Sequence, residues 1–329
     1  MLAVRPTTSE TAKDRSPALV QVHDPQPGPG EVLIAVRASA INRADLLQVR
    51  GQYPPPPDES PIPGLECAGR IEALGPETYG FKVGDRVMAL LAGGGHAEKV
   101  AVPVGQLMPM PDQLSFEDAA ALPEAALTAW TNLVAEARLM RGESVLIVAA
   151  VSGVGTFAVQ LARELGAKVF VAGRDLARLE RLRPLGADHC VLLDDELAKN
   201  IRSANDGRGV DVVFDMAAGP QVGQRLHAVK TGGRYVVIGT LAGRKAEIDL
   251  SDLLRRRLRL IGSVLRARSR EEKSRLCADF YRFAADRLRD GRLQPLVHRV
   301  YPFEAIAEAY AQLEQGGVFG KLVISMGEG

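Results

Sequence analysis

The stretch VLIVAAVSGVGTFAVQLARELG, residues 145–166, has the residue types that bind a nucleotide. It predicts a buried strand, a tight turn and a helix, an arrangement that presents free backbone N–H groups and the positive end of a helix dipole to a pyrophosphate. The glycine positions of the G-x-G-x-x-G pattern hold Ala150, Ser152 and Gly155. Ala150 and Ser152 are small enough for a phosphate to approach, and Gly153 adds bare backbone. An ordinary strand–helix connection is the alternative interpretation.

The residues at the end of the next apolar run, 167–173, indicate whether NAD or NADP is preferred. An NAD-preferring site places an acidic residue there, which binds the ribose 2′-hydroxyl. This chain has Gly173 and Arg174 at that place, with Arg178 one turn later. A guanidinium forms paired hydrogen bonds with a 2′-phosphate, so these residues favour NADPH. Asp175 is interpreted as a helix N-cap, and the alternative for both arginines is a solvated helix face.

The composition is that of a globular protein of about two domains. The chain has 329 residues, 46% apolar and 25% charged, and a net charge of +1, so no overall field attracts nucleic acid or an anionic membrane. No apolar run approaches the ~20 residues that span a bilayer. The N-terminal MLAVRPTTSETAKD lacks the apolar segment of a signal peptide. Three cysteines without a C-x-x-C pair indicate buried thiols in a reducing cytoplasm.

Two patterns of apolar and polar residues, one in each part of the chain, predict the strands and helices that position these residues. The first ~120 residues contain short alternating segments such as Glu31 to Ile41, which indicate an irregular β domain. From about Glu124 onward, apolar runs alternate with helical segments, which indicates an α/β domain with a doubly wound parallel sheet. The six expected strands are 144–150, 167–173, 190–193, 210–216, 233–239 and 258–265. A polar helix is expected from Arg270 to Arg289, and the last helix and strand are expected to fold back onto the first domain.

Several long motifs carry a resemblance to a known family. They are SAINRADLLQVRGQYPPP (39–56), IPGLECAGRIEALG (62–75), VGDRVMALLAGGGHAEKV (83–100), LPEAALTAW (122–130) and the closing FGKLVIS. In this order they resemble the zinc-free quinone oxidoreductase (zeta-crystallin-like) branch of the medium-chain dehydrogenase/reductase superfamily. The resemblance implies a GroES-like catalytic domain, residues 1–124 and 267–329, and an NADPH-binding Rossmann domain, residues 125–266. It also implies a homodimer joined through the last Rossmann strand.

The resemblance carries a prediction about metal. Zinc-dependent relatives place a cysteine ligand at the position of Asn42 and a histidine in a G-H-E motif that here reads Gly64-Leu65-Glu66. The loop of four closely spaced cysteines is missing too, so no metal site is expected. His96 is interpreted as a loop histidine. Oxidising an alcohol without a Lewis acid is difficult, whereas a quinone accepts hydride directly, so positioning supplies much of the catalysis.

Roles for single residues follow from the same resemblance. Asn42 and Thr128 are implied at the nicotinamide end, unless they are a turn residue and a helix hydroxyl bonded to the preceding turn. Tyr53, in the rigid GQYPPPP segment, is predicted to stack on a quinone, the alternative being a half-buried surface tyrosine. Asp45 and Glu66 are interpreted as structural partners. Further residues implied to border the cofactor are Gly153, Val154, Gly239, Leu265, Arg266, Phe319 and Lys321.

These predictions favour NADPH-dependent reduction of quinones or similar activated carbonyls. An enoyl-thioester reductase is an alternative enzyme on the same fold, and it needs a proton donor near the α-carbon. A non-catalytic NADPH-holding protein that binds RNA or acts as a sensor is an alternative of another class. Nucleic acid is not expected, because the basic stretch LLRRRLRLIGSVLRARSR, residues 253–270, contains no aromatic residue to stack on bases.

Overall fold

The computed structural model describes residues 1–7 and 15–327 and contains two compact units. Unit 1 consists of Met1–Leu127 and Leu265–Gly329, and unit 2 of Thr128–Val264. The expected boundaries, after residue 124 and before residue 267, thus differ from the observed ones by a few residues. The reason at the first boundary is that helix α3, Pro123–Trp130, continues across it, so no loop marks the change of unit.

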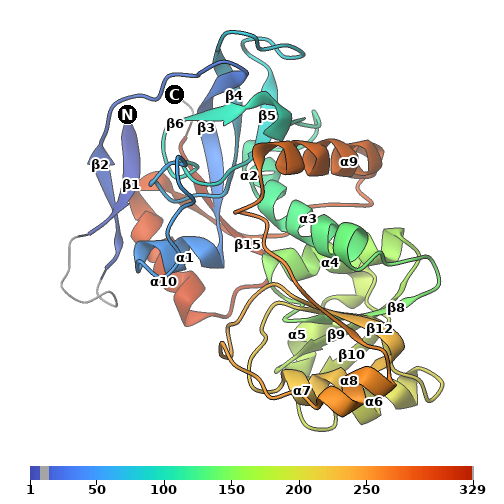
Figure 1. The fold of residues 1–329 in the computed structure, drawn as a ribbon. Helices are drawn as coiled ribbons and strands as arrows, with labels where there is room; N and C mark the ends of the chain where they lie inside the picture. The colour runs from blue at the N-terminus through green and yellow to red at the C-terminus, as the bar shows by residue number, and fades with distance from the viewer. Residues whose placement is uncertain (8–14, 328–329) are drawn as a thin grey trace. The chain divides into compact units, whose positions relative to one another are not determined.

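Unit 1 is built on an irregular β-sheet in which strands from both ends of the chain meet (Figure 1). The order is β14-β15-β3-β4-β5-β7, with β6 also paired to β3, and β1 and β2 form a separate two-stranded sheet. The closing strand β15 pairs antiparallel with β3, so the predicted return of the chain end to the first domain is confirmed. The strands are β1 (Leu2–Pro6), β2 (Pro17–Gln21), β3 (Glu31–Ile41), β4 (Glu66–Leu74), β5 (Arg86–Leu90), β6 (Lys99–Pro103), β7 (Leu107–Pro109), β14 (Val297–Pro302) and β15 (Lys321–Ser325).

The helices of unit 1 are mostly short. They are α1 (Arg43–Val49), α2 (Phe116–Ala120), α9 (Arg270–Arg289) and α10 (Ile306–Gln315), with 3₁₀ turns η2 (Val104–Gln106) and η5 (Phe303–Ala305). Helix α9 has the predicted bounds, begins after the N-cap Ser269 and packs against η2 and β7. Its buried face repeats at helical spacing, through Lys273, Cys277 and Phe280. A lysine therefore occupies a position where the pattern favours an apolar side chain.

Unit 2 contains the predicted six-stranded parallel sheet, in the order β10-β9-β8-β11-β12-β13. In chain order this is 3-2-1-4-5-6, so the direction of winding reverses between β8 and β11, which is where such sheets bind ligands. The strands are β8 (Ser144–Val148), β9 (Lys168–Gly173), β10 (His189–Leu192), β11 (Val210–Asp215), β12 (Val229–Val237) and β13 (Arg259–Gly262). The α/β fold class is confirmed.

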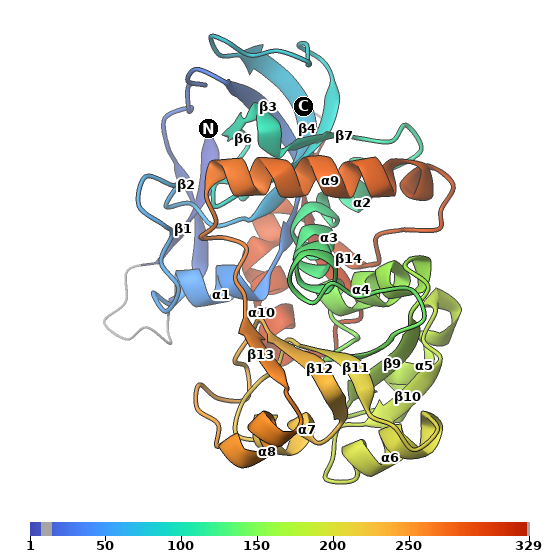
Figure 2. The same ribbon diagram turned by 45° about the vertical axis from the view of Figure 1, so that its right-hand side comes forward.

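Helices flank this sheet on both sides, with α4 on one side and α6, α7 and α8 on the other (Figure 2). Their bounds are α4 (Gly153–Glu164), α5 (Leu176–Glu180), α6 (Leu197–Ala204), α7 (Val222–Leu226) and α8 (Leu250–Arg255), with a 3₁₀ turn η4 (Arg183–Leu185). Helix α3 passes into a π-helical segment, Thr131–Glu136. Within residues 1–7 and 15–327, every helix is too short or too polar to cross a bilayer.

Candidate active site

The turn between β8 and α4 has the geometry of a pyrophosphate cradle. Ser152 is the N-cap of α4, and its Oγ accepts the N–H of Gly155 at 3.1 Å. The N–H groups of Gly153 and Val154 form no hydrogen bond within the described part of the chain, so they are free for an anion. A Cβ at Gly155 would lie 2.5 Å from the backbone oxygen of Ala150, so only glycine lets this helix pack so closely on the strand end.

The backbone at this turn is also held in an uncommon conformation. Ala149, directly after β8, has φ of 62°. A non-glycine residue in the left-handed region costs about 1 kcal/mol, and such strain gathers at ligand sites. The shape of the turn, the bare N–H groups and the twelve-residue helix behind them fit the pyrophosphate of a dinucleotide.

The other predicted cofactor residues of unit 2 follow neighbouring strands at the same edge of the sheet. Gly173 ends β9 and Gly239 lies just beyond β12, where a Cβ would meet the Met216 carbonyl oxygen at 2.6 Å. Arg174 is exposed and forms no ion pair with the described residues. Asp175 accepts the backbone N–H of Arg178 at 3.2 Å, which confirms the predicted N-cap. Because parallel strands end at one edge, these groups border the turn that carries Ser152.

Unit 1 contains a group of buried and half-buried polar residues, called here the polar cluster: Asn42, Asp45, Glu66, Glu124 and Lys321. Strand register explains how such distant residues meet. Leu322 in β15 pairs with Ile41 in β3, which places Lys321 beside Asn42. The pairing of β3 with β4 brings Glu66 to the same end.

The pairing of Lys321 with Glu66 dominates the polar cluster. Lys321 Nζ lies 2.6 Å from Glu66 Oε1 and 2.6 Å from Asn42 Oδ1. Asn42 Nδ2 donates to Glu66 Oε1 at 2.9 Å, and the backbone N–H of Glu124 donates to Glu66 Oε2 at 2.8 Å. Glu66 is 0% exposed and Lys321 5%. Both carboxylate oxygens of Glu66 therefore have partners, as a buried charge requires.

Two predicted cofactor residues, Asn42 and Lys321, belong to the polar cluster. The amide of Asn42 and the ammonium of Lys321 are bonded to each other and to Glu66, and their contact with the cofactor stays a prediction. Asp45 and Glu66 have the structural roles that the sequence indicates. Asp45 accepts the N–H groups of Asn42 at 2.7 Å and Gly64 at 2.9 Å, and so fixes the loop before α1.

The positions that hold zinc ligands in zinc-dependent relatives contain other chemistry here. Leu65 is a core residue, and Asn42 is an amide already bonded to Glu66. No arrangement of three or more His, Cys, Asp or Glu side chains suited to a metal occurs within residues 1–7 and 15–327. His96 is buried, which lowers its pKa, and its Nδ1 lies 2.9 Å from the Tyr310 hydroxyl. The positive charge next to Glu66 comes from Lys321 instead.

A second pair of predicted residues, Tyr53 and Arg266, is joined within unit 1. The Arg266 guanidinium lies 5.3 Å from the centre of the Tyr53 ring, a cation–π arrangement. Arg266 donates to the Ala92 carbonyl at 2.8 Å and to Gln48 Oε1 at 2.6 Å. Burial lowers the pKa of Arg266 and raises that of Tyr53. Arg266 is 3% exposed and holds the Tyr53 loop, and its predicted contact with the cofactor stays a prediction.

Three further predicted residues are buried. Thr128 is 8% exposed in α3, and its hydroxyl forms no hydrogen bond with the described residues. The expected alternative, a hydroxyl bonded to the preceding turn, is thus not observed. Leu265 and Phe319 are each 6% exposed and pack in unit 1.

Sequence reasoning missed two titratable residues at the polar cluster, Glu124 and Lys273. Glu124 Oε2 is buried and has no hydrogen-bond partner in the part of the chain that the structure describes. Burial, followed by the nearby Glu66 carboxylate, raises the pKa of Glu124 to about 8. Lys273 is 1% exposed on the apolar face of α9, and burial lowers its pKa. The charged residue in an apolar helical pattern was the signal available in the sequence for Lys273.

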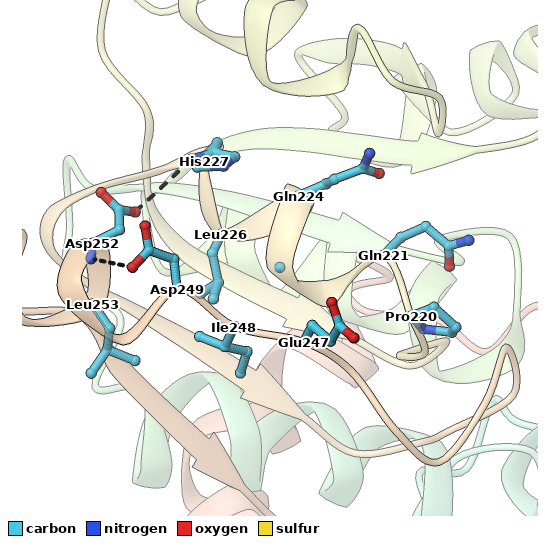
Figure 3. A pocket seen from close by; sticks show the side chains of 11 residues that line it. Pro220, Gln221, Gln224, Leu226, His227, Glu247, Ile248, Asp249, Asp252 and Leu253 are labelled. Atoms are coloured by element: carbon cyan, nitrogen blue, oxygen red, sulfur yellow. Dashed lines mark hydrogen bonds and ion pairs between the residues drawn. The ribbon is translucent and has the colours of Figure 1, made fainter.

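A hollow of about 590 Å³ lies elsewhere, between α7 and α8 of unit 2 (Figure 3). Two contacts join polar residues of its lining: Asp249 caps α8 by accepting the N–H of Asp252, and the Asp252 carboxylate lies 3.9 Å from His227 Nδ1. It contains none of the predicted site residues. Each unit therefore has its own candidate functional group: the turn between β8 and α4 in unit 2, and the polar cluster in unit 1.

Comparison with known protein families covers both units. Residues 28–112 match the alcohol dehydrogenase GroES-like domain, and residues 153–279 match the zinc-binding dehydrogenase family. Among curated proteins, the chain is 35% identical over 300 residues to the polyketide synthase GfsB of Streptomyces halstedii. That match covers 90% of this chain and 5% of the synthase, so the chain spans a small part of the length of this relative.

Solved structures of similar size match nearly end to end. An NAD-dependent alcohol dehydrogenase is 30% identical with a TM-score of 0.86, covering 99% of this chain and 100% of its own. The CurK enoyl reductase is 28% identical with a TM-score of 0.84, and 99% of each chain is covered. The quinone oxidoreductase of Pseudomonas syringae pv. Tomato DC3000 is 26% identical with a TM-score of 0.85, covering 98% and 99%. With both domain types and the strand order in agreement, this chain belongs to the medium-chain dehydrogenase/reductase superfamily.

Proposed function

We propose that this oxidoreductase uses NADPH to reduce acceptors in which a C=O or C=C bond is conjugated to a carbonyl, and that it does so without a metal. The observation that carries the proposal is the Lys321–Glu66 pair, with Nζ 2.6 Å from Oε1, beside Asn42 and Leu65, the positions where the resemblance places zinc ligands. A resident ammonium there already neutralises the buried carboxylate. Conjugated acceptors need no Lewis acid, because the second carbonyl or the thioester delocalises the charge that hydride brings.

Each residue group has a separate task in this proposal. The bound nicotinamide supplies the hydride, and the N–H groups of Gly153 and Val154 hold the pyrophosphate. The exposed Arg174 binds the 2′-phosphate, because a guanidinium pairs with a phosphate through charge-assisted hydrogen bonds. Tyr53, fixed by Arg266 at 5.3 Å, offers an aromatic face and a hydroxyl to a planar acceptor.

Quinones are the first acceptor class that we propose, and the similarity to a quinone oxidoreductase supports them. Enoyl thioesters are the second. They are favoured by the similarity to the CurK enoyl reductase and to a polyketide synthase, and by an acid at the polar cluster, Glu124. Reduction of a C=C bond requires a proton at the α-carbon, and a protonated carboxyl group supplies one.

A panel of acceptors tests the proposal. NADPH and NADH oxidation are followed in parallel with a benzoquinone and a crotonyl thioester, on protein whose metal content has been measured. We expect turnover with NADPH and less than one zinc per ten chains, and the ratio of kcat/KM values ranks the two acceptors. Stoichiometric zinc, or oxidation of simple alcohols at a higher rate, would overturn the metal-free assignment. Tight NADPH binding with no turnover would favour the non-catalytic alternative.

We further propose that two copies of the chain associate through β13. This strand ends the six-stranded sheet, so its outer N–H and C=O groups lack a strand partner among the described residues. Apolar side chains accompany it: Leu260 is 42% exposed and Val264 55%. Light scattering is expected to give a dimer mass, and Leu260→Arg to shift it toward the monomer; a wild-type monomer at micromolar concentration would refute the interface.

A further inference from the structure

We propose that Glu124 is the proton donor of the reaction: its carboxyl group delivers the proton that the acceptor needs after it has received hydride. This inference rests on the proposed reduction of conjugated acceptors and deepens it, because hydride transfer alone leaves the product one proton short. It assigns the task to a residue at the N-terminal turn of α3 that no sequence pattern singles out.

The position of Glu124 is fixed, while one end of its side chain remains free. Its backbone N–H donates to Glu66 Oε2 at 2.8 Å, which ties the start of α3 to the polar cluster. Its Oε2 is buried without a hydrogen-bond partner among the described residues. A buried polar atom normally has a partner, and one that has none marks a ligand or a bound water. A free carboxyl group of this kind can offer its O–H to a substrate.

Its place on α3 connects it with the predicted nicotinamide contact. Glu124 and Thr128 are four residues apart in one helix, so their side chains lie on the same face, one turn apart. The acid thus lies one helical turn from Thr128, the residue that the resemblance places at the nicotinamide end.

The charges around Glu124 decide its protonation state. The carboxylates of Glu66 on β4 and Asp45 on α1 disfavour its ionised form, and the ammonium groups of Lys321 on β15 and Lys273 on α9 favour it. Lys321 is bonded to Glu66 and Asn42, which leaves it less effective as a partner for Glu124. Burial and the two carboxylates therefore prevail, and the pKa of Glu124 rises to about 8, so the group carries a proton at neutral pH.

The proton balance of the step closes with groups on the chain. When an enoyl thioester takes hydride at its β-carbon, the electron pair of the C=C bond shifts toward the carbonyl oxygen. A C–H bond then forms at the α-carbon as the Glu124 O–H bond breaks, and the O–H electron pair stays on the carboxylate. With a quinone, the oxyanion takes the same proton. Water restores the acid, so one hydride and one proton are consumed per product.

Lys273 is suited to stabilise the carboxylate that this step leaves behind. It is buried, its ammonium forms no ion pair with the described residues, and both Glu124 and Glu59 act on its charge. An uncommitted cation next to a newly formed anion lowers the cost of the transfer. Lys273 is a positioning residue in this scheme, since it acts through Glu124.

The test compares Glu124→Gln with the matched control Glu304→Gln, an exposed glutamate in unit 1. The first readout needs neither cofactor nor acceptor: the infrared band of a protonated carboxyl group, followed from pH 6 to 10. The wild type and Glu304→Gln are expected to show a band that disappears with a midpoint near pH 8, and Glu124→Gln is expected to lack it. A band that is absent from the wild type, or that persists in Glu124→Gln, would overturn the proposal.

The second readout is the pH profile of kcat. Wild-type kcat is expected to fall above about pH 8, as the acid is lost, and Glu124→Gln is expected to lose about 100-fold at pH 7 together with this falling limb. Glu124→Asp retains a titrating acid and is expected to keep the limb at a lower rate. This variant keeps the test decisive if the glutamine variant does not fold.

The two proposals fail in different ways. If the wild type reduces none of the conjugated acceptors, the proposed function is overturned. If the wild type reduces them and Glu124→Gln keeps both the rate and the falling limb, the proton-donor assignment alone is overturned. If Tyr53→Phe, and not Glu124→Gln, loses the rate and the falling limb of the pH profile, the proton donor is the Tyr53 phenol and the assignment to Glu124 is overturned.

Discussion

Each unit of this chain contains a carboxyl group in a buried environment, Asp215 in unit 2 and Glu124 in unit 1. The two groups differ in how many hydrogen-bond partners they have. In unit 2, Asp215 at the end of β11 accepts from Arg225 at 2.8 Å, from the Tyr235 hydroxyl and from the N–H of Ala217 at 2.8 Å. In unit 1, Glu124 leaves Oε2 without a partner among the described residues. Asp215 is fully bonded and belongs to the core, whereas Glu124 is partly bonded and available.

The number of hydrogen-bond partners distinguishes a buried carboxyl group that stabilises the fold from one that is available for a reaction. The partners of Asp215 lie on α7, on β12 and just after β11, and the side chains of Asp215, Arg225 and Tyr235 are all buried. Both oxygens of this carboxyl group accept hydrogen bonds from donors that the fold supplies. Glu124 keeps its proton because burial and two neighbouring carboxylates outweigh the lysines. An unpartnered buried acid is costly for stability and therefore indicates function.

The largest expected effect comes from breaking the bonded carboxylate of unit 2. Asp215→Ala leaves the Arg225 guanidinium, 7% exposed, without its partner, and is expected to lower the free energy of unfolding by about 3–5 kcal/mol. Urea titration measures this. Asp195→Ala, an exposed aspartate of the same unit, is the control and is expected to stay within about 0.5 kcal/mol. Equal effects of the two would show that the Asp215 group contributes nothing.

Breaking the bonded pair of unit 1 ranks next. Lys321→Met removes the cation from Glu66 and is expected to cost about 3 kcal/mol, less than Asp215→Ala because Asn42 and the Glu124 N–H remain as partners. Adding Glu66→Gln in the same chain removes the stranded charge. The double variant is expected to be more stable than Lys321→Met alone, and thermal unfolding of the four members of this cycle checks the coupling. Additive losses would contradict a direct charge pair.

The exposed Arg174 belongs neither to the polar cluster nor to the Asp215 group, so its substitution is expected to change cofactor binding. Arg174→Glu is expected to raise the Kd for NADPH about 10- to 100-fold, or about 1.4–2.8 kcal/mol, because it removes a phosphate partner and adds repulsion. The Kd for NADH, which lacks the 2′-phosphate, is expected to change less than about threefold, by less than 1 kcal/mol. Fluorescence titration with both cofactors measures this. The same loss for both would refute the 2′-phosphate role; Arg178→Glu repeats the test one turn later.

The smallest expected effect is a pH dependence of stability. The pKa of Glu124 is raised from 4.5 to about 8 in the folded chain, so between these values the folded state binds a proton that the unfolded state lacks. Stability therefore falls as pH rises through this window, by about 1 kcal/mol from pH 7 to pH 8. Glu124→Gln is expected to remove this loss. Unfolding curves of both proteins at the two pH values decide it, and parallel curves would count against a protonated Glu124.

Local patterns predicted much of the fold correctly. All six strands of unit 2 were expected from apolar runs, although β12 begins at Val229 rather than 233 and β13 ends at Gly262 rather than 265. The N-cap at Asp175 and the bounds of α9 were also predicted. These features depend on residues that are neighbours in the chain, where periodicity and capping chemistry act. The pyrophosphate turn belongs to the same class, since strand, turn and helix are contiguous.

The polar cluster was predicted only in part, for a physical reason. Asn42 and Lys321 were predicted as site residues and Glu66 as a structural partner, but neither their bonds to one another nor the presence of Glu124 was predicted. The same holds for the bond of Arg266 to Gln48. Lys321 and Asn42 are 279 positions apart, and Arg266 and Gln48 are 218 apart. Which of several polar side chains meet across such separations depends on strand register and on how α9 seats against the sheet.

The amino-acid sequence by itself determined the class of each unit and the strand, turn and helix from β8 to α4, with the small residues of that turn. The tertiary structure decided which buried charges are bonded to one another and which acid keeps its proton. Covalent neighbours impose local geometry directly. The protonation state of Glu124, in contrast, is the sum of burial and of charges brought together from four separate elements.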